Sequence, residues 1–245
     1  MNLLLVTPDE LAADGTITLT DRRATHLRDV LGATPGQVVR IGVTRGQLGT
    51  ATVLTDDARA ITLRVELTAA ASAPLPIDLV LAVPRPKVLS RTLEIAAAFG
   101  VDRIDLTNAW RVDKSYLASP RLAPAALHQA ARLGAEQGAT THLPDITVHR
   151  RLMGLLDERW PAGAPAAPGT RIVFHPGAPP LEAVPLTGPI TLAIGPEGGW
   201  IPREVDTLVE RGFVTATIGA PILRVEAAVA AALGQLLLLL RSPRA

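Results

Sequence analysis

The sequence of 245 residues contains no cysteine. Disulfides, thiolate zinc sites and cysteine nucleophiles are therefore excluded. A chain without thiols suits the reducing cytoplasm, which is where we expect it to work. Aromatic residues make up only 3% of the chain, so few flat rings are available to stack on nucleic-acid bases.

An excess of either charge is also absent, since 24 Lys and Arg residues face 23 Asp and Glu residues. Any binding of nucleic acid must therefore come from a local basic surface rather than from the net charge. The first eight residues lack a basic region, so we expect no signal peptide. The apolar residues 227–240 are too few to cross a bilayer. We expect no membrane span, and a buried C-terminal helix that packs against another subunit.

The N-terminal part of the chain is predicted to be mainly β-structure. Strands rich in Val, Ile, Leu and Thr are expected at Val38–Val43, Leu48–Leu54 and Ile61–Leu67, with one helix at Ala24–Leu31. Short strands separated by turns predict a small β-barrel.

The pattern changes after residues 68–76, which have the composition of a linker. Strands and helices then alternate, which predicts a mainly parallel sheet covered by helices. The expected strands are 77–83, 103–106, 171–175, 190–194 and 214–218, and the expected helices are 86–99, 122–137, 202–211 and 224–240.

Two glycine-containing turns follow predicted strands. Gly195–Gly199 comes after the strand that ends at Ile194, and Gly219-Ala220-Pro221 comes after the strand that ends at Ile218. Ligands bind at the carboxyl ends of parallel strands, and glycine lets the backbone approach them closely. We therefore expect both turns to leave adjacent strands and surround one ligand. A plain tight connection is the alternative interpretation of each turn.

Several common activities lack their motifs. The chain has no Gly-x-Gly-x-x-Gly fingerprint and no Gly-Lys-Ser/Thr phosphate loop. It also lacks the His-Glu-x-x-His metal motif and the Gly-x-Ser-x-Gly nucleophile turn. Dinucleotide, ATP, metal and hydrolase sites are therefore not favoured.

Basic residues are concentrated in the middle of the chain. Residues 110–116 combine two aromatic side chains, two cations and a hydroxyl, a mixture that suits phosphate and a flipped base. The ordinary alternative is that these cations lie on solvated faces. The set consists of Arg85, Lys87, Arg91, Arg103, Arg111, Lys114, Arg121 and Arg132.

The string Ile194-Gly195-Pro196-Glu197-Gly198-Gly199, followed by Ile222-Leu223-Arg224-Val225-Glu226, resembles the SPOUT-class 16S ribosomal RNA uracil-N3 methyltransferases. Other landmarks of this family are similar to His26-Leu27, Glu136-Gln137-Gly138 and His175-Pro176. The resemblance extends over residues 24–226.

This resemblance implies an α/β fold in which residues 75–245 form a SPOUT methyltransferase domain. That domain would be a parallel sheet covered by helices, with a C-terminal trefoil knot. Residues 1–70 would form an RNA-binding PUA-like β-barrel. The implied protein is a homodimer that uses S-adenosylmethionine to methylate N3 of a uridine in 16S ribosomal RNA of the small subunit, without a metal or a membrane.

The implied site residues fall into three groups. The catalytic pair is Arg224, which would stabilise the uracil anion or hold a phosphate, and Glu226, which would orient Arg224 or act as a base. The ordinary alternative for Glu226 is a first-turn acid favoured by the helix dipole. Ile194, Gly195, Pro196, Glu197, Gly198, Gly199, Ile218, Gly219, Ile222 and Leu223 would bind the cofactor, and His26, Arg28, Arg85, Lys87, Arg111 and Lys114 would bind RNA.

The chain departs from the family pattern at a few positions. Pro221 replaces an arginine, and Val225 and Ala227 replace two threonines. Residues 95–101 lack a lysine and a glutamate of the family. Two alternatives therefore remain: a non-catalytic RNA-binding protein of the same fold, and a SPOUT methyltransferase that acts on another RNA such as transfer RNA.

Overall fold

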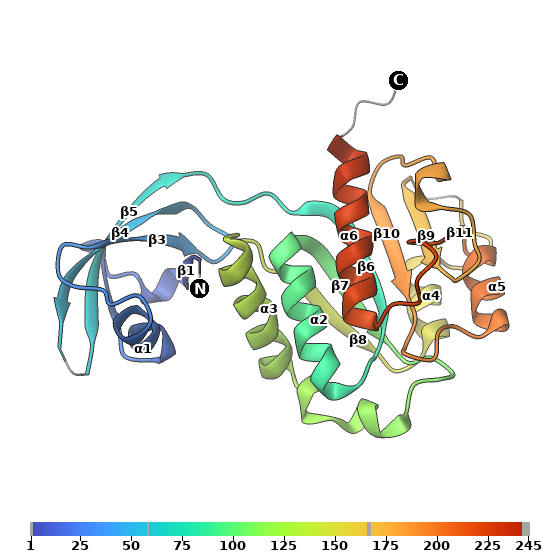
Figure 1. Ribbon diagram of the computed structural model, residues 1–245, viewed down its shortest axis with the longest axis horizontal. Helices are drawn as coiled ribbons and strands as arrows, with labels where there is room; N and C mark the ends of the chain where they lie inside the picture. Colours follow the sequence, from blue (N-terminus) through green and yellow to red (C-terminus); the bar gives the residue numbers. More distant parts are fainter. Residues whose placement is uncertain (1, 58, 166–167, 242–245) are drawn as a thin grey trace.

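The N-terminal part of the chain folds into a mixed sheet of five strands. In the computed structural model, which describes residues 2–57, 59–165 and 168–241, the strand order is β1-β3-β4-β5-β2. Helix α1 packs on this sheet, and Ala24 and Leu27 of the helix lie in its core (Figure 1). The elements are β1 (Leu4–Val6), η1 (Pro8–Glu10), β2 (Thr16–Leu19), α1 (Arg22–Asp29), β3 (Val38–Val43), β4 (Leu48–Asp56) and β5 (Ile61–Ala69).

The rest of the chain forms a six-stranded sheet in the order β11-β9-β10-β6-β7-β8, with every pair parallel. The predicted parallel sheet is confirmed. Its strands are β6 (Leu75–Ala82), β7 (Val101–Thr107), β8 (Asp145–His149), β9 (Thr170–Phe174), β10 (Ile190–Ile194) and β11 (Phe213–Ala216). All five residues of β10 are buried, as expected for a central strand covered on both faces.

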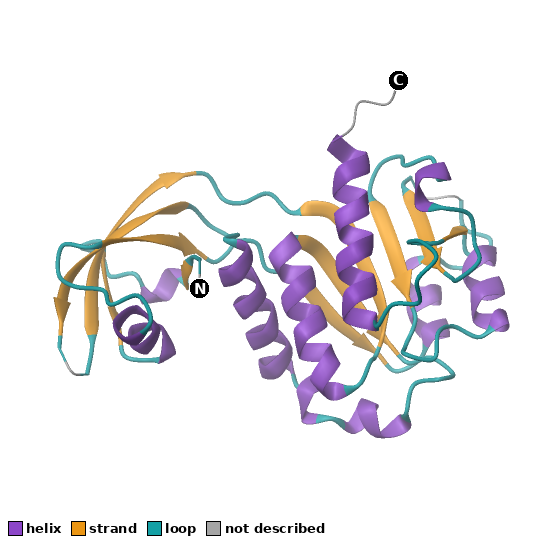
Figure 2. Cartoon of the chain, in the orientation of Figure 1, coloured by secondary structure: helices purple, strands orange, loops and turns teal. Residues whose placement is uncertain are grey.

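Helices cover both faces of this sheet. Helices α2 (Pro86–Phe99), α3 (Pro124–Gly138) and α6 (Val225–Arg241) stand in a row over one face, while α4 (Leu152–Arg159) lies behind the sheet and α5 (Pro202–Glu210) near its β11 edge (Figures 1 and 2). Short 3-10 helices η2 (Lys114–Ala118), η3 (Pro120–Leu122) and η4 (Leu181–Ala183) lie in the connections. None of the described helices is long and apolar enough to span a membrane.

Local sequence explains the ends and the close packing of these helices. Helix α2 begins with Pro86 and stops at Gly100, whose φ of 81° is left-handed, as the sequence predicts. A Cβ on Gly134 or Gly138 would lie 2.1 or 2.2 Å from a backbone oxygen of α2. Glycine at these positions lets α3 pack directly against the backbone of α2.

The two sheets are joined by more than the connection between them. Successive residues at the start of β1 face opposite ways, so Leu4 lies in the N-terminal core while Leu5, and Leu3 just before the strand, pack against α2 and α3. The backbone N–H groups of Asn2 and Leu3 both donate to the carbonyl of Glu136, at 3.1 Å. The first strand therefore anchors the N-terminal sheet to α3.

Some boundaries differ from the prediction. The predicted linker at residues 68–76 is shorter, because Ala69 pairs with Leu48 and Leu75 pairs with Val101. Four elements, β1, β2, β8 and α4, which have 3 to 8 residues, are not predicted by the sequence patterns.

Candidate active site

The carboxyl ends of the parallel strands meet along one edge of the six-stranded sheet. The glycine turn Gly195–Gly199 follows β10, and the second turn follows β11. The prediction that these two strands are adjacent is wrong, because β9 pairs with β10 on one side and with β11 on the other. Strand order depends on long-range pairing, which the order of elements in the sequence does not determine.

The glycine turn is tightly folded on itself. The N–H of Gly199 donates to the carbonyl of Pro196 at 2.7 Å, and Gly199 has a φ of 71°. A Cβ on Gly195 would lie 2.9 Å from the backbone N of Trp200. Only glycine fits at position 195 without movement of the turn.

Loops after the neighbouring strands hold this turn in place. The backbone N–H of Arg85, after β6, donates to the Glu197 carboxylate at 2.9 Å. The guanidinium of Arg111, after β7, donates to the carbonyl of Gly198. The backbone N–H of Trp110 donates at 2.8 Å to the carboxylate of Glu204 in the first turn of α5. Hydrogen bonds therefore link the loops after β6, β7 and β10, which are neighbouring strands of the sheet, and Glu197 accepts one of these bonds.

The second turn lies against the C-terminal helix. The carbonyl of Ile218 accepts a hydrogen bond of 2.6 Å from the side chain of Gln235 in α6. Ile222 is 90% exposed and Leu223 is 39% exposed, and Arg224 is exposed beside them. Ile218 and Gly219 line a cavity of about 440 Å³ together with Pro180, Glu182, Thr217, Gln235, Leu238 and Leu239.

Two buried polar atoms at this edge have no hydrogen-bond partner among the described residues. They are Nε1 of Trp200, which follows the glycine turn directly, and Oε2 of Glu226, in the first turn of α6. An unsatisfied buried polar atom costs about 1–3 kcal/mol, which a polar ligand can recover. Trp200 directly follows the glycine motif in the sequence, and this position alone makes it a candidate site residue.

This arrangement fits S-adenosylmethionine. The tight turn exposes backbone to a ligand, and the orphaned indole N–H is a free donor for an adenine nitrogen or a carboxylate. The orphaned oxygen of Glu226 is a free acceptor. Among the described residues, no group of His, Asp or Glu is arranged to hold a metal ion.

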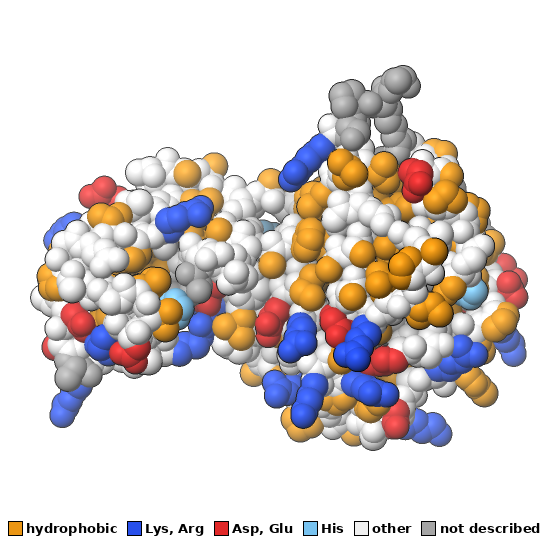
Figure 3. Space-filling view, viewed as in Figure 1, with side chains coloured by type: hydrophobic (Ala, Val, Ile, Leu, Met, Phe, Trp, Pro, Cys, Tyr) orange, Lys and Arg blue, Asp and Glu red, His pale blue; other side chains and the backbone are white. Residues whose placement is uncertain are grey.

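Four of the predicted RNA-binding residues lie at this edge and are exposed: Arg85, Lys87, Arg111 and Lys114. Arg91 and Arg121 are exposed as well, and Arg121 contacts Ser90 of α2 at 3.5 Å. Basic side chains gather over the lower ends of α2 and α3 and the 3-10 helices beneath them (Figure 3). We call these exposed side chains the basic surface; they are Arg85, Lys87, Arg91, Arg111, Lys114 and Arg121. A chain with a balanced net charge needs such a local surface to bind nucleic acid.

The other two predicted RNA-binding residues, His26 and Arg28, lie on α1 in the N-terminal part. Burial lowers the pKa of the half-buried His26, which favours its neutral form. Arg28 donates to the Asp56 carboxylate at 2.6 Å and to the carbonyl of Asp57 at 2.7 Å. Arg28 therefore offers less free charge to a phosphate than the exposed cations beside the glycine turn.

A buried charged cluster beneath α4 is not predicted by the sequence. Asp105 of β7 is fully buried and accepts hydrogen bonds from Arg103, from His149 at 3.0 Å and from Arg159 at 2.6 Å. Burial acts to raise the pKa of Asp105, but these hydrogen bonds outweigh it and the pKa is lowered. The cluster ties α4 and β8 to the sheet and thereby positions the edge strand.

Comparison with known proteins places these features in context. The RNA methyltransferase domain family matches residues 71–237. The ribosomal RNA small subunit methyltransferase E of Treponema pallidum is 27% identical over 236 residues, which cover 95% of this chain and 89% of the relative. The enzyme of the same name from Synechocystis is 26% identical over 98% of this chain and 78% of its own length.

Solved structures show the same fold. The ribosomal RNA small subunit methyltransferase E of Neisseria gonorrhoeae, bound to S-adenosyl methionine, superposes with a TM-score of 0.78 at 24% identity, over 98% of both chains. A methyltransferase from Legionella pneumophila, in complex with the same cofactor, superposes with a TM-score of 0.78 at 21% identity, over 97% of both chains.

Proposed function

Because this chain belongs to the RNA methyltransferase domain family, we propose that it transfers a methyl group from S-adenosylmethionine to N3 of a uridine in 16S ribosomal RNA. Family membership confirms the predicted enzyme class, and S-adenosylmethionine is the methyl donor of this class. The proposed RNA is supported by relatives named as methyltransferases of the small ribosomal subunit, at 27% and 26% identity. Such a substrate implies work in the cytoplasm, alongside ribosomes.

The observation that carries the donor site is the glycine turn after β10. Its hydrogen bonds to Arg85 and Arg111 hold it in place, and the indole N–H of Trp200 beside it has no partner in the described part of the chain. We assign donor binding to residues 194–199 and to Ile218, Gly219, Ile222 and Leu223. The 440 Å³ cavity that Ile218 and Gly219 line supports the assignment of these two residues.

The reaction needs a deprotonated nitrogen, because uracil N3 becomes a good nucleophile only after its proton leaves. When bound, the donor supplies an electrophilic methyl group on sulfur. Arg224 is exposed at this edge and can stabilise the uracil anion or hold a neighbouring phosphate. The unpartnered Oε2 of Glu226 is available to accept the N3 proton or to orient Arg224. The target base must be unpaired or flipped, since N3 is engaged in a duplex.

The domain architecture that we propose for this protein is the one that the family resemblance implies. Residues 1–70 form a PUA-like β-barrel that binds RNA, and residues 75–245 form a SPOUT domain with a C-terminal trefoil knot. Two sheets with separate apolar cores support this division. The protein acts as a homodimer, and the apolar side chains exposed on α6 support a subunit interface there.

Mass spectrometry of 16S ribosomal RNA tests the substrate. A strain that lacks the gene should lose one N3-methyluridine, and the purified enzyme should restore it on small subunits from that strain. Loss of a methylated base from transfer RNA instead would favour the alternative SPOUT activity. Calorimetry with S-adenosylmethionine separates both from a non-catalytic RNA-binding protein, which we expect to bind no donor.

The variant Arg224→Ala tests the catalytic assignment. We expect methyl transfer to be abolished, because the uracil anion or the neighbouring phosphate loses the cation assigned to it, while the affinity for S-adenosylmethionine stays close to that of the wild type. Single-turnover assays and calorimetry on the same preparation measure the two effects. Wild-type turnover by this variant would refute the role of Arg224.

A further inference from the structure

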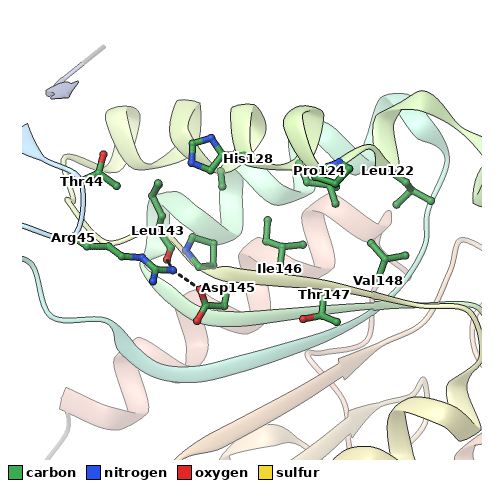
Figure 4. A pocket seen from close by; sticks show the side chains of 13 residues that line it. Thr44, Arg45, Leu122, Pro124, His128, Leu143, Asp145, Ile146, Thr147 and Val148 are labelled. Atoms are coloured by element: carbon green, nitrogen blue, oxygen red, sulfur yellow. Dashed lines mark hydrogen bonds and ion pairs between the residues drawn. The ribbon is translucent and has the colours of Figure 1, made fainter. Parts of the chain in front are cut away.

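A second cavity, of about 600 Å³, lies away from the glycine turn and between the two sheets. Helix α3 forms one wall, β8 forms the other, and the turn between β3 and β4 closes one end. Thr44 and Arg45 lie at that end, while Leu122 and Val148 lie at the other (Figure 4). The lining is Thr44, Arg45, Leu122, Pro124, Leu127, His128, Ala131, Leu143, Pro144, Asp145, Ile146, Thr147 and Val148. We call this cavity the β8 groove.

Strand β8 is the outermost strand of its sheet, since in the described chain it pairs only with β7. Its other edge therefore presents backbone N–H and C=O groups along the groove. The walls beside this edge are mainly apolar, and Val148 is 40% exposed. The groove thus combines apolar surface with a strand edge whose hydrogen-bonding groups are unpaired in the described chain. At a rise of about 3.3 Å per residue, this edge is about 13 Å long.

Cations flank both ends of the groove. Arg150 and Arg151 follow β8 directly and are exposed, and Arg121 precedes Leu122. These three have no ion-pair partner within 4 Å in the part of the chain that the structure describes. At the other end, Arg45 is held by ion pairing with Asp145 and by a hydrogen bond of 3.3 Å to the carbonyl of Leu143. Leu122 connects the groove to the basic surface beside the glycine turn.

We infer that the β8 groove binds single-stranded RNA beside the target nucleotide. Bases would lie on the apolar walls with their edges on the backbone of β8, and phosphates would lie near Arg121, Arg150 and Arg151. An extended peptide could also use the strand edge, but the unpaired cations and the continuity with the basic surface favour RNA. The inference rests on the proposed function, because the RNA in the groove must continue from a target base that is held at the carboxyl ends of the β-strands.

The two edge strands provide a matched pair of variants. Val148 on β8 is 40% exposed and Val214 on β11 is 44% exposed, at opposite edges of the same sheet. Val148→Glu places a carboxylate in the groove, and we expect the affinity for undermethylated small subunits to fall about tenfold or more because the carboxylate repels phosphate and disrupts the apolar wall. Val214→Glu should leave this affinity unchanged. Neither variant should alter binding of S-adenosylmethionine.

A second measurement uses the salt dependence of RNA binding. Arg150→Gln should reduce the slope of log affinity against log salt by about 0.7, the value for one phosphate of a single strand. Hydrogen exchange of the wild type should show protection of residues 145–148 by the subunits. Protection of these amides by extended peptides but not by subunits would overturn the inference.

The outcomes also separate this inference from the proposed function. If the wild type methylates small subunits and Val148→Glu binds them equally well, the groove assignment is wrong and the function stands. If the wild type neither binds nor methylates them, the proposed function is wrong, and the groove assignment, which rests on it, is wrong as well.

Discussion

Gly195 illustrates how a single residue determines the shape of the proposed donor site. A Cβ at this position would lie 2.9 Å from the backbone N of Trp200 and 3.2 Å from the carbonyl carbon of Gly199. Gly195→Ala must therefore displace the turn, because both contacts are with backbone. We expect the affinity for S-adenosylmethionine, measured by calorimetry, to fall about tenfold or more, which corresponds to about 1.4 kcal/mol.

Gly154→Ala in α4 is the matched control. No heavy atom lies within 4 Å of a Cβ at Gly154. Alanine is the better helix former, so this variant should be more stable by about 0.5–1 kcal/mol, with unchanged donor binding. Normal donor affinity in Gly195→Ala would mean that the glycine turn is not part of the donor site.

At the scale of elements, Glu10 connects η1 to α1. Its carboxylate accepts hydrogen bonds from the backbone of Thr7 at 2.8 Å and from Arg23, a buried cation that is 5% exposed. The hydrogen bond from Arg23 is the main cause that lowers the pKa of Glu10 to about 2. Since the folded pKa is depressed, this stabilisation is fully present above about pH 4.5 and is lost as the pH falls toward 2.

Glu10→Gln tests this connection. At pH 7 we expect a loss of about 2 kcal/mol in the free energy of unfolding, because Asp21 is then the only carboxylate partner of Arg23 among the described residues. The difference between wild type and variant, from urea titrations, should shrink from pH 4.5 downward. A difference that is independent of pH would contradict the assigned pKa. Asp9→Asn, at an exposed residue of the same 3-10 helix, should change little.

Elements with strong local signals were predictable from sequence. Helix α2 carries Pro86 at its start and Gly100 after its end, and β10 is a short apolar run between a proline and a glycine. Strand β8 was missed because its residues are mostly half-buried or exposed, which is typical of an edge. Helix α4 was missed because it is held by the contacts of Arg159 with Asp78 and Asp105, which lie far from it in the sequence.

At the scale of the whole molecule, α6 leaves apolar side chains uncovered. Leu238 is 65% exposed and Leu240 is 42% exposed. Hydrophobic side chains gather over α6 and the loop beside it (Figure 3). If this face forms the interface of the proposed homodimer, Leu238→Glu should yield a monomer in sedimentation equilibrium, because the interface would have to bury an unpaired charge.

Val209→Glu on α5, at a residue that is 47% exposed, provides the control and should leave the assembly state unchanged. A wild-type chain that sediments as a monomer at micromolar concentration would contradict the homodimer. A dimer that survives Leu238→Glu would place the interface elsewhere on the surface.

The sequence by itself determined the enzyme class that we predicted and that the family match confirms, because the glycine turn and the Leu223-Arg224-Val225-Glu226 segment are each contiguous and their residue types carry the resemblance. Only the tertiary structure decided the position of β9 between β10 and β11, the unpartnered indole of Trp200 and the groove beside β8. These features depend on pairing and burial between residues far apart in the chain, and no local pattern of side chains encodes such contacts.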